Sequence, residues 1–306
     1  MSNSADPIEG AARDSPFRCG RVAVVGRPNV GKSTLVNALV GARISITSRK
    51  AQTTRHRVLG ILTSADAQYV FVDTPGFQTQ HASALNHRLN SSVRAGIGGV
   101  EVVVWVIEAG RITPGDREVL ALLPRDVPVI VALNKVDRVT DRSRLLPAIA
   151  EVAALRDFAA IVPVSAEKRW QLDDLLAEAR AHLPVGAAMY PDDDVTDRDE
   201  RFLAAEYIRE KIFRLLGAEV PYSTSVVIDS FDHKRELRTI HATIYVEKAG
   251  QRAMLLGAGG ERMKSIASSA RRDMEALFGG KVFLEVWVKV KSGWSSDERM
   301  LDRLGY

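Results

Sequence analysis

Short runs of β-branched residues alternate with helix-length amphipathic stretches between Arg21 and about Pro184. The runs that read as strands are RVAVV (21–25), RVLGIL (57–62), QYVFVD (68–73), VVVWVI (102–107), VIVAL (129–133) and AAIVPV (159–164). A short polar connection, TSADA (63–67), joins the second and third runs as a hairpin and adds one antiparallel strand. The alternation predicts an α/β fold, a doubly wound and mostly parallel sheet with helices on both faces.

The pattern changes after a proline and an acidic run, MYPDDDVTD (189–197). A helix is expected from about Asp197 or Asp199 to Gly217, with an apolar stripe at Phe202, Ala205, Ile208, Ile212 and Leu215. Two strands (222–231 and 237–246), a short helix (251–256), a longer helix (261–278) and a last strand (281–290) follow. The order α-β-β-α-α-β predicts a second, smaller α+β domain. The expected division is a disordered tail (1–19), a first domain (20–187), a linker (188–200) and a second domain with its C-terminal tail (201–306).

Composition narrows the class of protein. The chain has 306 residues, 46% of them apolar, which is enough for two cores. The single cysteine, Cys19, can form no internal disulfide, and this fits a reducing compartment. No apolar run reaches the length of a membrane span, and the polar first 19 residues contain no hydrophobic signal core. We therefore expect a cytoplasmic protein. A net charge of +4 is compatible with an RNA partner without requiring one.

The stretch GRPNVGKS (26–33) directly follows a strand and opens a helix. It matches G-x-x-x-x-G-K-S/T, in which bare backbone N–H groups and a helix N-terminus converge on phosphates. Lys32 is expected to reach the β and γ phosphates, and the Ser33 hydroxyl to bind Mg²⁺. The predicted phosphate-binding residues are Gly26, Arg27, Pro28, Asn29, Val30, Gly31, Lys32, Ser33 and Thr34.

Three further stretches lie at the ends of expected strands, where a nucleotide switch needs them. In VFVDTPG, Asp73 is placed to hold Mg²⁺ through water, and the Gly76 N–H to meet the γ-phosphate. In VALNKVD, the Asp137 carboxylate can accept two hydrogen bonds from guanine, whereas adenine would leave it poorly paired. The segment VSA (164–166) can close over the base. The predicted nucleotide contacts here are Asp73, Thr74, Pro75, Gly76, Phe77, Asn134, Lys135, Val136, Asp137, Ser165 and Ala166.

These motifs resemble the translation-factor-like branch of P-loop GTPases over residues 20–184. The resemblance implies that SITSRKAQTTRHR (45–57) is the first switch, with Thr54 meeting Mg²⁺ and γ-phosphate and Thr53 as the alternative. Lys32, Thr54 and Gly76 are then the catalytic set, and Ser33, Thr54 and Asp73 the Mg²⁺ set. The basic residues of this segment fit either a solvated loop or an RNA contact.

Two positions bear on hydrolysis. Many GTPases carry a water-orienting glutamine after the DTPG motif, but this chain has Phe77, which predicts slow intrinsic hydrolysis. Asn29 resembles the asparagine that coordinates potassium in related GTPases, so a K⁺ requirement is a further hypothesis.

The stretch GAGG (257–260) has the G-x-x-G form and lies between two expected helices. With the flanking order of elements it resembles the type II KH module, whose glycine loop clamps single-stranded nucleic acid by its backbone. Ile266 and Ile244, beside the loop, are expected to form a base-facing groove. Because the middle loop positions are not basic, the electrostatic attraction has to come from neighbours. The predicted RNA contacts are Gly257, Ala258, Gly259, Gly260, Arg262, Lys264 and Ile266.

A GTPase followed by a KH module resembles the Era family of bacterial GTPases. The longest stretches that carry the likeness are DRDERFLAAEYIREKIFRLLGAEVPYS (197–223) and VKVKSGWSSDERMLDRLGY (288–306). The resemblance implies binding of GTP and GDP with Mg²⁺, the 3′ end of 16S rRNA and the small ribosomal subunit as partners, and peripheral contact with the inner membrane; we expect a monomer. Two alternatives stay open: a signalling switch whose second domain docks a protein, and a P-loop ATPase or kinase.

Overall fold

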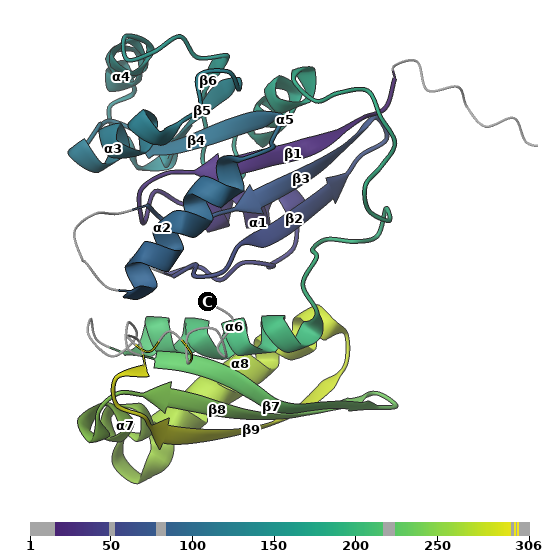
Figure 1. Cartoon of the computed structure of the whole chain (residues 1–306), viewed down its shortest axis with the longest axis vertical. Helices are drawn as coiled ribbons and strands as arrows, with labels where there is room; N and C mark the ends of the chain where they lie inside the picture. The colour runs from purple at the N-terminus through teal and green to yellow at the C-terminus, as the bar shows by residue number, and fades with distance from the viewer. Residues whose placement is uncertain are drawn as a thin grey trace, which may run out of the picture.

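The computed structural model describes residues 16–48, 53–77, 84–216, 224–294, 297 and 299. Figure 1 shows two α/β units joined by one extended segment, the first above the second. The first unit contains β1 (Arg18–Val25), α1 (Lys32–Val40), β2 (Val58–Thr63), β3 (Ala67–Asp73), α2 (Ala84–Ile97), β4 (Val102–Glu108), α3 (Pro114–Leu122), β5 (Val129–Asn134), α4 (Leu145–Ala153), β6 (Ala160–Pro163) and α5 (Leu172–Ala181).

The six strands of the first unit form one sheet in the order β2-β3-β1-β4-β5-β6. Only β2 runs antiparallel, paired with β3 through the expected hairpin, so the doubly wound fold is confirmed. Apolar side chains of α1 and α5 cover one face, and those of α2, α3 and α4 cover the other. Because the sheet is buried on both faces, its strands read as nearly continuous apolar runs. The strand order reverses beside β1, which places the loop after β1 at the usual ligand-binding crevice.

The start of the first strand differs from the expectation. The tail was predicted to include residues 1–19, but Arg18 and Cys19 already belong to β1 and pair with Ala67 and Gln68 of β3. Cys19 is buried rather than exposed in a tail, and burial raises the pKa of its thiol. The sequence signal was weak because the strand begins with charged and small residues instead of β-branched ones. Residues 1–15 lie outside the described part of the chain.

The second unit contains α6 (Glu200–Leu215), β7 (Thr224–Lys234), β8 (Leu237–Val246), α7 (Ala249–Leu256), α8 (Glu261–Phe278) and β9 (Lys281–Val290). This is the predicted α-β-β-α-α-β order. The sheet runs β7-β8-β9, with β7 antiparallel and β9 parallel to β8. Apolar side chains of all three helices pack on the same face of this sheet. Within the described parts of the chain, every helix is too short or too polar to span a bilayer.

Helix α6 begins where the sequence indicates and buries a different stripe. The Asp199 carboxylate caps the helix by accepting the Phe202 N–H at 2.8 Å. Ile208 and Ile212 are fully buried, as expected, but Leu215 is 48% exposed. The same helix buries charged side chains in its second to fourth turns: Glu206, Arg209, Glu210 and Lys211. Helix α6 lies on the side of the second unit that faces the first (Figure 1), and two of these side chains reach that unit: Glu210 accepts the Thr47 N–H, and Arg209 donates to the Thr53 carbonyl.

The connecting segment is fastened to the first sheet. The Ile61 N–H of β2 donates to the Val195 carbonyl at 2.9 Å, and Thr196 forms a bridge with Gly60. Gln68 of β3 donates to the Tyr190 carbonyl at 2.8 Å. The expected linker is thus an added edge to the sheet until it reaches α6.

Candidate functional site

The loop between β1 and α1 has the backbone that phosphate binding needs. Gly26 has φ 156°, and a Cβ there would lie 2.4 Å from the Val106 carbonyl oxygen. Gly31 has φ 102°, and a Cβ there would lie 2.4 Å from the Asn134 amide nitrogen. Both positions therefore require glycine. The loop ends at the N-terminus of α1, where unpaired N–H groups favour an anion.

Lys32 is held inside this loop. Its Nζ donates to the carbonyls of Gly26 at 3.0 Å and Arg27 at 3.1 Å, and the side chain is 6% exposed. Burial lowers the pKa of Lys32 to about 8; the Asp73 carboxylate opposes this shift and Arg27 adds to it. A buried ammonium held by the carbonyls of this loop, close to the N-terminus of α1, suits a phosphate ligand.

The predicted Mg²⁺ residues converge. The hydroxyl oxygens of Ser33 and Thr54 lie 2.7 Å apart, so α1 and the first switch meet here. Asp73 at the end of β3 is fully buried, and burial raises the pKa of its carboxyl while Lys32 opposes the rise. The Ser33 and Ser45 hydroxyls lie close enough to favour the charged form, yet neither Asp73 oxygen makes a hydrogen bond of good geometry among the described residues. A buried carboxylate beside two hydroxyls fits a hard divalent cation such as Mg²⁺. The same geometry supports Thr54 over Thr53.

The DTPG motif (73–76) lies against the phosphate loop. A Cβ on Gly76 would lie 2.8 Å from Pro28 Cα, so a side chain at this position would clash with the phosphate loop. The Thr74 hydroxyl donates to the Val24 carbonyl at 2.9 Å and fixes the turn after β3. Phe77 is 7% exposed and packs in the core of the first unit, where it cannot orient a water molecule.

Asn134 at the end of β5 organises the base side of the site. Its Nδ2 donates to the Val30 carbonyl at 2.8 Å, and its Oδ1 accepts the Lys135 and Ala166 N–H groups at 2.8 and 3.0 Å. Lys135 has φ 66°, and its Nζ donates to the Asn29 carbonyl at 2.7 Å. One motif thereby joins the phosphate loop to the loop after β6.

Two cavities meet around the phosphate loop. A small one of about 50 Å³ is lined by Lys32, Ser33, Thr54 and Gly76 among others. A larger one of about 840 Å³ is lined by Asn29, Gly31, Thr34, Thr47, Ser48, Lys135, Arg138, Glu167, Phe213 and Arg214. Asp137 borders a separate cavity, and Ser165 Oγ donates to its Oδ1 at 2.6 Å. The role of Asp137 in guanine recognition therefore stays a prediction.

The glycine loop of the second unit is exposed between α7 and α8. Gly257, Gly259 and Gly260 have φ values of 72°, 58° and 82°, and a Cβ on Gly257 would lie 2.8 Å from Arg262 Cβ. This bare, left-handed backbone at a helix N-terminus can approach phosphates closely. Arg262 and Lys264 are exposed beside it, although Arg262 Nη1 donates to the Met254 carbonyl at 2.6 Å.

Ile266 and Ile244 are not part of an RNA groove. Both are fully buried in the core of the second unit, so the prediction that Ile266 contacts RNA is wrong for this structure. The physical reason is helical period: Met263, Ile266, Ala270 and Met274 lie on the one face of α8 that packs against the sheet.

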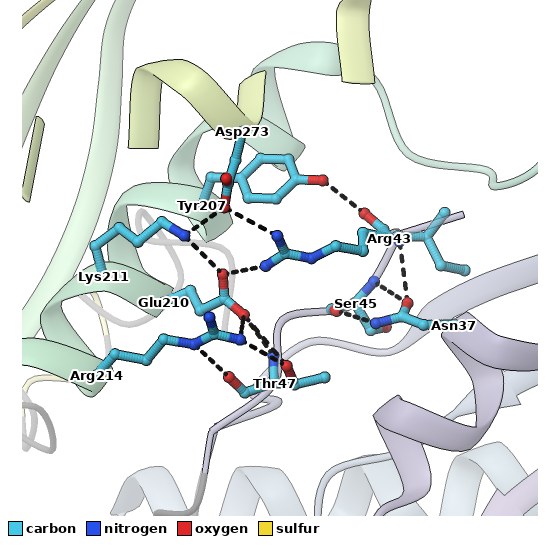
Figure 2. Close-up of polar contacts among 10 residues, drawn as sticks. Asn37, Arg43, Ser45, Thr47, Tyr207, Glu210, Lys211, Arg214 and Asp273 are labelled. Carbon is cyan, nitrogen blue, oxygen red and sulfur yellow. Dashed lines mark hydrogen bonds and ion pairs between the residues drawn. The ribbon is translucent and has the colours of Figure 1, made fainter. Parts of the chain in front are cut away.

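The sequence did not indicate that α6 makes a set of polar contacts with the first switch, here called the clasp. Glu210 is fully buried, and its Oε1 accepts the Thr47 N–H at 3.0 Å (Figure 2). Around this carboxylate lie the cations of Arg43, Lys211 and Arg214, and Asp273 of α8 pairs with the first two of them.

Three more contacts extend this clasp. The Tyr207 hydroxyl donates to the Arg43 carbonyl at 2.8 Å, and Arg214 donates to the Thr47 hydroxyl at 3.1 Å. Further along the switch, Arg209 donates to the Thr53 carbonyl, next to the predicted Mg²⁺ residue. The one sequence signal for these contacts is that four of the six residues 206–211 of α6 are charged.

Comparison with known proteins supports the predicted class of each half of the chain. A family model described as a 50S ribosome-binding GTPase matches residues 21–135, and one described as a KH domain matches residues 219–295. The proteins named GTPase Era from Chromobacterium violaceum and Neisseria meningitidis are each 54% identical to this chain, over 95% and 97% of its length and 99% and 98% of theirs.

Two solved structures are similar along the chain. One is an Aquifex aeolicus Era variant bound to GDP and AlF₄⁻, with a TM-score of 0.91 and 36% identity. The other is Era in complex with MgGDPNP and nucleotides 1506–1542 of 16S ribosomal RNA, with a TM-score of 0.90 and 36% identity. Each likeness covers 95% of this chain and 99% of the other.

Proposed function

Because the chain belongs to the Era family of GTPases, we propose that it is a nucleotide-controlled switch that grips the 3′ end of 16S rRNA and assists assembly of the small ribosomal subunit. The chain binds and hydrolyses GTP and carries a KH domain. The observation that carries the proposal is the contact between the first switch and α6, since that helix packs in the core of the second unit, which contains the KH match.

In this proposal the phosphate loop and Lys32 hold the β and γ phosphates of GTP. Ser33, Thr54 and Asp73 suit Mg²⁺, which would supply positive charge to the phosphates when bound. The Gly76 backbone lies against the phosphate loop, where its N–H can meet the γ-phosphate. With Phe77 in the core, catalysis rests on positioning and charge, which favours slow turnover. The side chain of Asn29 is exposed beside the loop, and a K⁺ ion there is part of the hypothesis.

The nucleotide state reaches the KH domain through α6. Thr54 faces Ser33 on the nucleotide side, while the neighbouring Thr53 carbonyl accepts from Arg209 of α6. A γ-phosphate that repositions Thr54 therefore displaces an atom bonded to α6. Because α6 packs on α8, which begins at the glycine loop, this movement can change how the loop presents itself to RNA.

The test is RNA affinity in two nucleotide states. Fluorescence anisotropy with labelled RNA of nucleotides 1506–1542 is measured with GDP and with GDPNP, over a salt series. We expect tighter binding with GDPNP and an affinity that falls steeply with salt. Gly257→Asp should abolish RNA binding and preserve GTP binding. Because that change strains a left-handed glycine, Ala258→Asp serves as a second variant that adds the same charge without a clash.

Equal affinity in both nucleotide states would refute the coupling, and full RNA affinity in both aspartate variants would refute the KH assignment. The rival from another class is a switch whose second domain docks a protein. It predicts weak, non-specific RNA binding that ignores the nucleotide. The cytoplasmic location, peripheral membrane contact and monomeric state belong to the same proposal and stay predictions.

A further inference from the structure

A cavity of about 310 Å³ lies between the two domains, behind the first switch. Its walls come from the end of that switch, α2, the end of the connecting segment, α6 and β7. The lining residues that the argument uses are Arg55, His56, Arg57, Arg198, Glu206 and Arg209. The cavity is separate from the nucleotide site, because Thr54 faces Ser33 whereas the next three residues of the chain line this cavity.

The cavity is strongly basic. Four arginines contribute to its lining, and Glu206 is the one acidic residue among the lining residues that the structure describes. Glu206 is committed to Arg209, whose Nε and Nη2 donate to its two oxygens at 2.7 and 2.6 Å. Asp197 lies outside the lining and approaches Arg198 at 3.6 Å. Counting both acids, the described residues of the cluster carry four arginines against two carboxylates.

His56 lies among these arginines in the lining of the cavity. Burial lowers the pKa of His56 to about 4; Glu206 opposes the shift, and Arg209, Arg55 and Arg198 add to it. The imidazole is therefore neutral at physiological pH and does not add to the charge. The positive charge of the cavity therefore comes from its guanidinium groups alone.

The arginines are held in place by contacts to other groups. Arg55 Nη1 donates to the Thr224 carbonyl at 2.9 Å, and its guanidinium lies 5.8 Å from the centre of the Phe213 ring. Arg198 lies 4.7 Å from the centre of the Phe202 ring and donates to the Arg57 carbonyl. Fixed guanidinium groups bind phosphate with little loss of side-chain entropy.

We propose that this cavity is a second anion site that binds a phosphate group, carried either by a small phosphorylated molecule or by an RNA backbone. A guanidinium cluster matches phosphate oxygens through paired N–H donors. The volume equals that of about ten water molecules in the liquid, which is enough for a diphosphate and part of its hydration. A phosphate bound here joins the first switch to α6 and stabilises the arrangement of the two domains. The inference goes beyond the proposed RNA switch and does not depend on it.

The experiment measures binding of inorganic pyrophosphate to the full-length protein whose nucleotide site is saturated with GDP and Mg²⁺. Titration calorimetry and ³¹P line broadening give the affinity. The test variant is Arg57→Ala with Arg198→Ala, since these two side chains are the more exposed arginines of the cluster and their loss leaves the Arg209–Glu206 pair intact. The matched control is Arg117→Ala, an exposed arginine on α3 outside the cavity. Thermal melts establish that both variants are folded.

We expect one pyrophosphate per chain beyond the nucleotide site, bound at least tenfold more weakly by the double variant and unchanged in the control. No binding to the GDP-saturated protein, or equal loss in both variants, would overturn the proposal. A third arm repeats the titration with saturating RNA of nucleotides 1506–1542. Competition, together with weaker RNA binding by the double variant, identifies the RNA backbone as the source of the phosphate. Binding that persists identifies a small phosphorylated ligand.

Discussion

Glu210→Gln tests the clasp between the KH domain and the first switch. The substitution keeps the shape of the side chain, and its amide oxygen can still accept the Thr47 N–H. Its NH₂ group, however, replaces the carboxylate oxygen that pairs with Arg43 and Lys211, and so sets a donor against two cations. We expect the contact to loosen without loss of the fold.

The magnitude follows from burial. Breaking a fully buried ion pair costs about 3–5 kcal/mol because a charge is left without its partner. Here Lys211 is 6% exposed, whereas the Arg43 and Arg214 side chains are 41% and 46% exposed and can turn to water. Screening of the two arginines reduces the expected cost to about 2 kcal/mol. If this contact opposes opening of the first switch, the opening equilibrium should shift toward the open state by about 30-fold.

Hydrogen exchange measures this opening directly. The amide of Thr47 donates to Glu210, so peptides covering residues 44–48 and 53–57 should exchange about 30-fold faster in the variant. Peptides from the interior of β5 should not change. Glu178→Gln, on the exposed face of α5, is the matched control. Exchange at Thr47 that is equal in the two variants would refute the idea that α6 restrains the switch.

Three other predictions concern the nucleotide site. Burial lowers the pKa of Lys32 to about 8, and a bound phosphate favours its charged form, so GDP binding should take up a proton at pH 8.5 and almost none at pH 7. Calorimetry in two buffers of different ionisation enthalpy measures this proton uptake, and equal uptake at both pH values would contradict the prediction. Asp137→Asn should shift preference from guanine to xanthine nucleotides in competition assays, and an unchanged preference would show that the base is read elsewhere. Turnover should be faster in K⁺ than in Na⁺ buffer if Asn29 binds a potassium ion, and equal single-turnover rates would exclude that role.

Local signals predicted the two folds because the decisive interactions are local. The central strands of the first sheet are buried on both faces and are therefore visible apolar runs, and each glycine motif combines a fixed spacing with a strand or helix boundary. The start of α6 was visible for the same reason, since an aspartate before a helix is a capping signal.

Errors and omissions occurred where a residue's role depends on a distant partner. Ile266 lies near the glycine loop in sequence, but the helical face on which it falls turns it into the core. Glu210 reads as an ordinary surface acid of a helix. Only the packing of α6 against a segment about 160 residues earlier makes it a buried partner of Thr47, and one sequence carries no record of that contact.

The fastening of the connecting segment limits how the KH domain can travel. The backbone stays paired with the first sheet until Thr196, and α6 begins at Glu200, so three residues with a reach of about 10 Å join them. Two of the three still contact the first unit through their side chains, since Asp197 accepts the Leu59 N–H and Arg198 donates to the Arg57 carbonyl. The N-terminal end of α6 is thereby held close to the first sheet and can act as a hinge. Its 16 residues form a lever about 24 Å long, and a swing of about 10° carries the far end, where Arg214 contacts Thr47, through about 4 Å. A rotation of this size is enough to break the contact between Arg214 and Thr47 while the connecting segment stays paired with the first sheet.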